Sequence, residues 1–433
     1  MNDAESHVDP DDKRDLTAGT GSYAVLRNRD FLLYLIGRFV AVVGQQMFTM
    51  AVGWEIYERT GSAFSLGLVG LTQIVPMFLL TLPAGHLADN YKRKRTIVLT
   101  TLVIAVANLG MALISTQAAP VRWIYVCLFV TGAARTFLAA ATASFLPQLV
   151  ARKDFSRAVT WNTGTFQLAS IVGPAAAGAL IALTHRQAAP VYALNALAAL
   201  VFCVMLSLVR TDHTVINREK MSLKTLLTGF SFVFANRIIL GVISLDMFAV
   251  LLGGATALLP IYARDILSVG PRGLGMLQAA LPLGAVVGAF IQAHRPPLQK
   301  AGRSLLWAVT AFGAATIVFG FSKWFGLSFL MLLLCGMVDS VSVVVRHTLV
   351  QMLTPDDKRG RVSAVNNLFI NTSNELGEFE SGIVAHGFGP AIGNAIQTGA
   401  VISVVSGGIG TILVVLAVAW LWPEIRKYGR LDV

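Results

Sequence analysis

The chain has 433 residues, of which 55% are hydrophobic and only 13% are charged, and its formal net charge is +11. A soluble domain carries about 25% charged residues, so this composition excludes a soluble globular enzyme. Apolar runs long enough to cross a bilayer, about 20 residues, recur along nearly the whole chain and predict an all-α membrane protein. In a membrane protein, a positive net charge is better explained by basic loops that face anionic lipid than by a nucleic-acid partner.

The N-terminal half begins with a polar tail. Residues 1–30 lack the apolar region of a signal peptide, and we expect them to form a disordered cytoplasmic tail. Six spans are predicted within residues 31–209, which would form an N-terminal six-helix bundle. They lie near residues 31–57, 62–87, 96–115, 122–145, 158–183 and 189–209.

The C-terminal half follows a polar linker, residues 210–236. Part of this linker, residues 221–235, has leucines and phenylalanines at helical spacing and predicts an amphipathic helix on the inner membrane surface. Six further spans are predicted within residues 237–422, and residues 423–433 would form a second cytoplasmic tail. The spans lie near residues 237–264, 272–293, 303–322, 325–348, 361–386 and 391–422.

The basic residues predict the orientation of these twelve spans. Most of the 34 lysines and arginines fall on one side, in segments such as KRKR (92–95) and DDKRGR (356–361). Cytoplasmic loops carry such an excess, so both termini are expected in the cytoplasm.

The two halves contain a weak internal repeat. Shifting the chain by 204 or 208 positions superimposes identical residues from corresponding spans, which predicts two pseudo-symmetric six-helix bundles, the organisation of major facilitator transporters. The first offset pairs Gly132 with Gly336, Gly173 with Gly377 and Gly178 with Gly382, and the second pairs NRD at 28–30 with NRI at 236–238 and Gly67 with Gly275.

One motif connects the repeat to a family. The segment GHLADNYKRKRTI, residues 85–97, resembles the signature of the major facilitator superfamily between its second and third helices. The matching positions are Gly85, Asp89, Lys92 (where the family usually has glycine), Arg93 and Lys94.

A second segment and several shorter ones narrow the resemblance. GPAAAG, residues 173–178, resembles the core of the antiporter motif of the family's exporters, with Gly173, Pro174 and Gly178 as a helix kink. RNRDFLLYLIG, VGWEIYERTGSA, GAARTF and SNELGEFESG resemble the enterobactin-exporter branch. This resemblance covers about residues 23–425.

The resemblance implies the major facilitator fold, alternating access and a gate in the loop that contains Asp89. Its carboxylate would accept hydrogen bonds from the start of the eleventh span, near Arg361, and hold the cytoplasmic side closed. Alternatively, KRKR serves only to orient the chain. The first, fourth, seventh and tenth spans would line a central cavity.

Charged residues within spans are the candidates for function, because charge at the bilayer centre costs about 2.5–3.5 kcal/mol. Arg38 in the first span corresponds to Asp246 in the seventh, and Arg135 in the fourth corresponds to Asp339 in the tenth. This pattern predicts a cavity with a basic N-terminal wall and an acidic C-terminal wall. The acids would exchange protons or form locking ion pairs, and the arginines could also hold an anionic substrate.

The stretch NELGEFESG, residues 374–382, places three carboxylates in the eleventh span. Glu375 lies past the midplane and is a second candidate for proton exchange, since a neighbouring Glu378 one turn away favours protonation of one of the two. Glu378 and Glu380 lie nearer the outer mouth, where they would form an acidic vestibule.

Three further polar residues of the first span are candidates for lining the cavity. Glu55 lies near its outer end, where a solvated mouth is the favoured interpretation. Gln45 and Gln46 would line the cavity or form interhelical hydrogen bonds.

The sequence contains no HExxH, GxSxG or phosphate-binding GxxxxGK[ST] motif, and Cys127, Cys203 and Cys335 have no metal-ligand spacing. We therefore expect no enzyme activity, cofactor or metal. The hypothesis is a monomeric secondary transporter in the bacterial inner membrane that exports small amphipathic molecules, siderophores or lipophilic drugs, in exchange for protons or sodium. The alternatives are a lysophospholipid flippase on the same fold and a membrane receptor or scaffold.

Overall fold

The computed structural model describes residues 23–210, 230–296, 299–355, 358–391 and 396–429. Within these ranges, eleven helical segments are long and apolar enough to cross a membrane. The main helices are α2 (Arg29–Thr60), α3 (Ala63–Asn90), α4 (Arg93–Thr116), α5 (Arg122–Leu149), α6 (Phe155–Leu183), α7 (Ala189–Ser207), α9 (Arg237–Leu252), α10 (Leu259–Ile261), α11 (Gly270–Ala293), α12 (Ala301–Phe321), α13 (Phe325–Leu353), α14 (Arg359–Ala391), α15 (Ile396–Leu421) and α16 (Pro423–Lys427).

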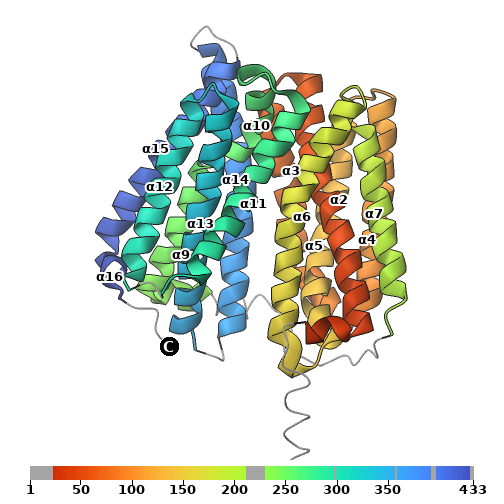
Figure 1. Ribbon diagram of the computed structural model, residues 1–433, viewed down its shortest axis with the longest axis horizontal. Coiled ribbons are helices and arrows are strands. Elements are labelled where there is room, and N and C mark those ends of the chain that lie inside the picture. Colours follow the sequence, from red (N-terminus) through yellow and green to blue (C-terminus); the bar gives the residue numbers. More distant parts are fainter. Residues whose placement is uncertain (1–22, 211–229, 297–298, 356–357, 392–395, 430–433) are drawn as a thin grey trace, which may run out of the picture.

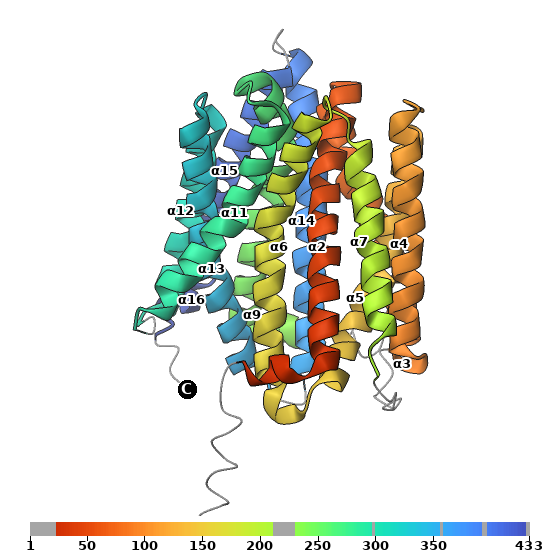
Figure 2. The ribbon, with the colours of Figure 1, turned by 45° about the vertical axis from the view of Figure 1, so that its right-hand side comes forward.

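Helix α14 is the twelfth long helix and corresponds to the predicted span 361–386. It is 33 residues long but is not among the eleven apolar segments. It packs against α3, α9 and α15, and it lies in the middle of the molecule in Figure 2. Its polar residues are therefore placed among other helices, where charge in a membrane is tolerated.

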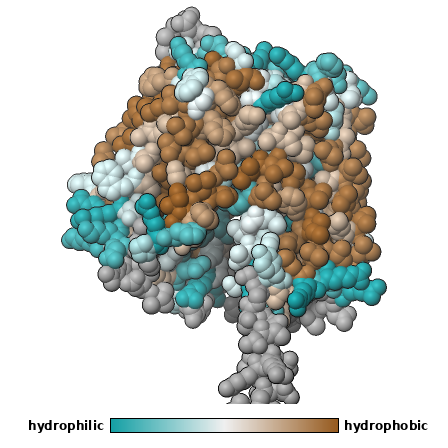
Figure 3. Space-filling view, viewed as in Figure 1, coloured by the Kyte–Doolittle hydropathy of each residue, from teal (hydrophilic) through white to brown (hydrophobic). Residues whose placement is uncertain are grey.

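The helices form two groups that stand side by side, α2–α7 and α9–α16 (Figure 1). We call them the N-terminal and C-terminal bundles. Apolar side chains cover the middle of the face shown in Figure 3, and hydrophilic ones lie at its upper and lower ends. The lower end carries the start of α2, and we call it the inner end because its basic segments predict that it faces the cytoplasm.

The first helix of each bundle begins with the same cap. The side chain of Asn28 accepts hydrogen bonds from the backbone N–H groups of Asp30 and Phe31, and that of Asn236 accepts them from Ile238 and Ile239. An asparagine at this position satisfies N–H groups that have no partner within the helix. These are the two NR segments that the 208-residue offset superimposes.

Two close helix crossings join the bundles, and each is built on a pair of glycines. Where α6 meets α11, a Cβ atom on Gly178 would lie 2.4 Å from the Pro271 carbonyl oxygen and 3.2 Å from the Gly275 Cα. Where α3 meets α14, a Cβ atom on Gly382 would lie 2.6 Å from the Gly67 Cα. Small residues allow such close approach of membrane helices.

The two crossings are related by the internal repeat. The 204-residue offset carries Gly178 to Gly382, and the 208-residue offset carries Gly67 to Gly275. The repeat therefore positions corresponding contacts on the two sides of the boundary between the bundles. Of the motif GPAAAG, Pro174 and Gly178 pack on α11, while Gly173 packs on Gln46 of α2.

The seventh predicted span, 237–264, is not one continuous α-helix. Helix α9 ends at Leu252, with Gly253 as its C-cap, and a 3-10 turn (Ala255–Leu258), α10 and a π-helical turn (Tyr262–Ile266) complete the span. A Cβ atom on Gly254 would lie 2.5 Å from the Gly377 carbonyl oxygen of α14. The break thus brings α9 close to the acidic segment of α14.

The predicted tail 1–30 falls mostly outside the described residues, as does the linker 210–236 with most of its amphipathic segment.

Candidate functional site

A cavity of about 420 Å³ lies between the two bundles, with walls from α3, α5 and α14. Figure 3 shows the surface hollowed between the bundles at the inner end. The lining comprises Gln73, Met77, Thr81, Ala84, Gly85, Gly132, Arg135, Thr136, Ala139, Ala140, Ala364, Asn367, Leu368, Asn371 and Glu375.

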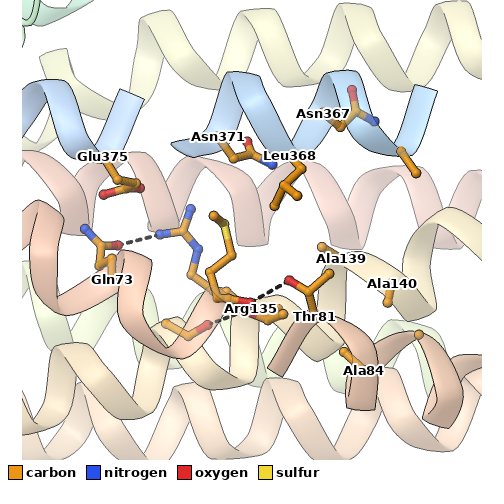
Figure 4. Close-up of a pocket in the computed structure, with 15 residues that line it drawn as sticks. Gln73, Thr81, Ala84, Arg135, Ala139, Ala140, Asn367, Leu368, Asn371 and Glu375 are labelled. Atoms are coloured by element: carbon orange, nitrogen blue, oxygen red, sulfur yellow. Dashed lines mark hydrogen bonds between the residues drawn. The ribbon is translucent and has the colours of Figure 1, made fainter. Parts of the chain in front are cut away.

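Arg135 is the cation of this cavity. Its Nη1 donates a hydrogen bond to Oε1 of Gln73 at 3.0 Å, and its guanidinium points toward α14 (Figure 4). Gly132, one turn earlier on α5, packs on the Pro76 side chain. A Cβ atom on Gly132 would lie 3.1 Å from that side chain. This contact brings α5 close to α3, so that Gln73 can fix the orientation of Arg135.

Glu375 is the acid of the same cavity and comes from the other bundle. Its backbone carbonyl lies against Gly70 of α3, only 2.6 Å from where a Cβ atom would stand, which positions the side chain next to the N-terminal bundle. Glu375 and Glu378 both act electrostatically on Arg135. The structure nevertheless has no ion pair between Arg135 and either acid in its described part, and Oε2 of Glu375 is buried without a hydrogen-bond partner.

The remaining polar groups of the cavity are neutral. Thr81 and Thr136 contribute hydroxyls, Asn367 and Asn371 contribute amides, and Figure 4 shows Asn371 between Asn367 and Glu375 on α14. No aromatic side chain occurs in the lining given above. The cavity thus offers one cation, one acid and several hydrogen-bonding groups between alanines and glycines.

Asp246 and Asp339, the acids that the repeat predicted for the C-terminal wall, do not line this cavity. Both line a much smaller cavity inside the C-terminal bundle, between α9, α12 and α13. Asp246 forms an ion pair with Arg346 of α13, and the two residues are 8% and 4% exposed. The acid that faces Arg135 is therefore Glu375, and the partner of Asp246 is Arg346, which the repeat did not indicate.

The predicted groups of α2 serve the interior of the N-terminal bundle. Arg38 donates a hydrogen bond to the Tyr34 hydroxyl at 3.0 Å, and Gln46 donates one to the Ser170 hydroxyl at 2.8 Å. Nε2 of Gln45 is buried without a partner.

Glu55 does not form a solvated mouth, contrary to expectation. It is 7% exposed and accepts hydrogen bonds from Arg59 at 3.1 Å and from the Tyr192 hydroxyl at 2.7 Å. These partners compensate the carboxylate charge and permit its burial.

The signature motif lies at the inner ends of α3 and α4. Gly85 lines the central cavity. Arg93 donates to the carbonyls of Ala88 and Ser144, and Lys94 donates to those of Ser207 and Val209.

These two basic residues therefore connect helix ends within the N-terminal bundle, whereas Lys92 is exposed at the start of α4. The side chain of Asp89, the predicted gate, lies outside the described part of the structure.

The outer ends of the bundles are joined by a group of residues that the sequence did not single out. Tyr57 donates a hydrogen bond to Asp265, and Arg264 donates one to the Tyr57 carbonyl at 3.1 Å. Glu58 lies between Arg264, at 3.7 Å, and Arg186, at 3.6 Å. We call these five residues the outer cluster. Their polar character at a helix end was a usable signal, but nothing in the sequence showed that the two ends meet.

The described residues contain no group of three or more histidines, cysteines and acidic residues that could hold a metal ion.

Two proteins of similar sequence are named enterobactin exporters. The chain is 26% identical over 402 residues to the enterobactin exporter EntS of Escherichia coli O1:K1, with 92% of this chain and 93% of the relative covered. It is 27% identical to the enterobactin exporter EntS of Citrobacter koseri, with the same fractions of the two chains covered.

Solved structures share the fold. A bacterial homologue of the human lysosomal transporter Spinster, in an inward-facing and unoccupied conformation, superimposes with a TM-score of 0.73 at 15% identity and covers 93% of this chain and 98% of its own. The nucleoside transporter NupG superimposes with a TM-score of 0.69 at 14% identity, covering 92% and 100%. The family model of the Major Facilitator Superfamily matches residues 34–377. The chain belongs to the major facilitator superfamily of membrane transporters and not to an enzyme family.

Proposed function

We propose that this transporter exports a small, oxygen-rich anionic solute in exchange for protons, and that Glu375 carries the proton. One observation supports this most: Arg135 of one bundle and Glu375 of the other face each other across the cavity without forming an ion pair. A ligand group or a proton can therefore change the interaction between the bundles at this point.

The proton step follows from the surroundings of Glu375. A buried carboxylate with no hydrogen-bond partner on one oxygen binds a proton more readily than a solvated one. Ionised Glu375 can accept hydrogen bonds from hydroxyl groups of the solute while Arg135 holds an anionic group, so the solute binds from the inside to the deprotonated site. A proton that reaches Glu375 from the outside removes this acceptor and favours release of the solute, and the proton then travels inward in the solute-free carrier.

The substrate class follows from the lining and from the relatives. Arginine, amide and hydroxyl groups recognise oxygen anions and hydroxyls, whereas a lipophilic cation would favour an aromatic and acidic lining. The similar proteins from Escherichia coli and Citrobacter koseri are named enterobactin exporters. A catecholate siderophore is therefore the first substrate to test, ahead of a lipophilic cationic drug.

The test is uptake of enterobactin into everted membrane vesicles with and without an imposed pH gradient, acidic inside. The native chain should accumulate the siderophore in a gradient-dependent manner, and Glu375→Gln should lose that dependence. Glu380→Gln is the matched control, because it neutralises an acid of the same helix that does not line the cavity.

Three results would contradict the proposal. Gradient-dependent transport by Glu375→Gln would exclude Glu375 as the proton carrier, and dependence on a sodium gradient would change the coupling ion. Movement of a fluorescent lysophospholipid in place of enterobactin would identify a flippase.

A further inference from the structure

A second, larger cavity lies on the C-terminal bundle, away from the central one. It has a volume of about 560 Å³ and is lined by the inner ends of α11 and α13. We call it the α11–α13 groove. Its walls are mainly apolar and include Ile291, Met337, Val338, Val341 and Val344.

The groove exists because the two helices are in close contact above it and diverge toward their inner ends. A Cβ atom on Gly284 would lie 2.0 Å from the Leu333 carbonyl oxygen, and one on Gly288 would lie 2.6 Å from that of Met337. Below this crossing Gln292 donates a hydrogen bond to the Ser340 hydroxyl at 2.9 Å. Gly288 and Met337 thus line the upper end of the groove, and the Gln292 amide lies about one turn further along α11.

The groove faces outward from the bundle. The groove residues of α13 lie on one face of that helix. Asp339, Ser342 and Arg346 lie on the opposite face, toward the interior of the bundle. Val344 and Ile291 are 44% and 37% exposed. Apolar side chains exposed on this side of a membrane-spanning helix meet lipid.

The length and the depth of the groove match one leaflet of a bilayer. From Met337 to Thr348 the helix rises about 16 Å at 1.5 Å per residue, and half of a hydrocarbon core of about 30 Å is about 15 Å. The groove begins near the middle of α13 and ends at Thr348, in the inner part of a helix that continues to Leu353. An acyl chain of the inner leaflet therefore fits it lengthwise.

Its inner end is basic. Arg295 lines the groove just beyond the end of α11 and is exposed, as are Lys300 and Arg303 at the start of α12. Among the described residues none of these three forms an ion pair with an acid. A cation at this depth lies at the level of the lipid phosphates, where basic pockets between helices bind anionic head groups.

We propose that the α11–α13 groove is a binding site for an anionic phospholipid of the inner leaflet, with an acyl chain along Val341 and Val344 and the phosphate at Arg295. The apolar walls favour a lipid over free phosphate, and the unpaired arginine favours an anionic head group over a zwitterionic one. This proposal does not depend on the substrate that the central cavity transports.

Native mass spectrometry of the purified chain, titrated with phosphatidylglycerol or phosphatidylcholine of identical acyl chains, tests the site. An arginine near the membrane surface contributes about 1 kcal/mol to binding of anionic lipid, so Arg295→Gln should weaken phosphatidylglycerol retention about fivefold. Arg303→Gln, which removes a basic residue at the start of α12 that does not line the groove, should have no such effect. Val344→Trp, which fills the groove with the charge retained, should weaken retention as well.

Equal retention of phosphatidylglycerol by the native chain, Arg295→Gln and Val344→Trp would overturn the proposal. So would equal retention of both lipids by the native chain, since that would show only the general lipid shell of a membrane protein. Displacement of phosphatidylglycerol by excess inorganic phosphate would also overturn it, because the site would then recognise phosphate without the acyl chain.

Discussion

Asp246 and Arg346 form a buried ion pair in the C-terminal bundle, and its energetics limit what a substitution there can show. Both side chains are almost inaccessible to solvent. Removing one partner of such a pair costs about 3–5 kcal/mol, because the other charge remains buried without compensation. Loss of transport in Asp246→Asn would therefore not identify Asp246 as a proton carrier.

We predict that Asp246→Asn lowers the thermal unfolding temperature in detergent, whereas Asp246→Asn combined with Arg346→Gln restores most of the loss. The double variant removes both charges, and a buried pair is often replaceable by neutral groups at little cost. Thermal unfolding followed by the exposure of buried cysteines measures both effects. Additive losses in the double variant would show that the pair is not the source of the stability.

The sequence predicted which residues are charged within spans, but not which of them meet. The internal repeat relates Arg135 to Asp339 because the two occupy equivalent places in different bundles. Residues at equivalent positions in the two bundles need not be in contact with each other. The acid that lines the cavity opposite Arg135 is Glu375, and that placement depends on how the bundles lie against each other.

At the scale of elements the repeat was more informative, because it acts through local contacts. Asn28 and Asn236 cap corresponding helices, and the repeated glycines occur at corresponding crossings. The break after α9 was missed, although Gly253-Gly254 is a recognised interruption signal. The apolar run from residue 237 to 264 continues through the break and concealed it.

The glycine crossings give a prediction for α6. Gly178→Val should destabilise the chain by about 1–3 kcal/mol, as overpacking does, because its Cβ atom would lie 2.4 Å from the Pro271 carbonyl oxygen. Gly164→Val on the same helix is the matched control, since nothing lies within 4 Å of its Cβ position. Both variants change helix propensity in the same way, so the difference in unfolding temperature reports the crossing. Equal losses would show that the contact with α11 contributes nothing.

At the scale of the whole molecule the two ends of the bundle boundary differ. The central cavity reaches Gly85 and Ala364 near the inner ends of α3 and α14, whereas the outer cluster joins α2 to the end of the seventh span. The sequence predicted two bundles and their orientation. It could not predict which end is closed, because Tyr57 and Asp265 are 208 residues apart in the chain.

Alternating access requires the outer cluster to separate when the inner end closes. Each hydrogen bond to a charged group contributes about 1.5–3 kcal/mol, so Tyr57→Phe should shift the ratio of inward-open to outward-open molecules by about tenfold or more. The measurement is labelling of Asn367→Cys, which lines the cavity and is exposed there, by an impermeant maleimide in everted vesicles of a chain without its three native cysteines. Labelling should be slower in Tyr57→Phe than in the parent.

Arg59→Gln is the matched control for this experiment. Arg59 also lies at the outer end of α2, but its partners Glu55 and Ala119 belong to the same bundle, so its loss should leave the labelling rate unchanged. If Tyr57→Phe labels as fast as the parent, the hydrogen bond to Asp265 does not hold the outer end closed. If both variants slow labelling equally, the effect arises within the N-terminal bundle and not from the contact between bundles.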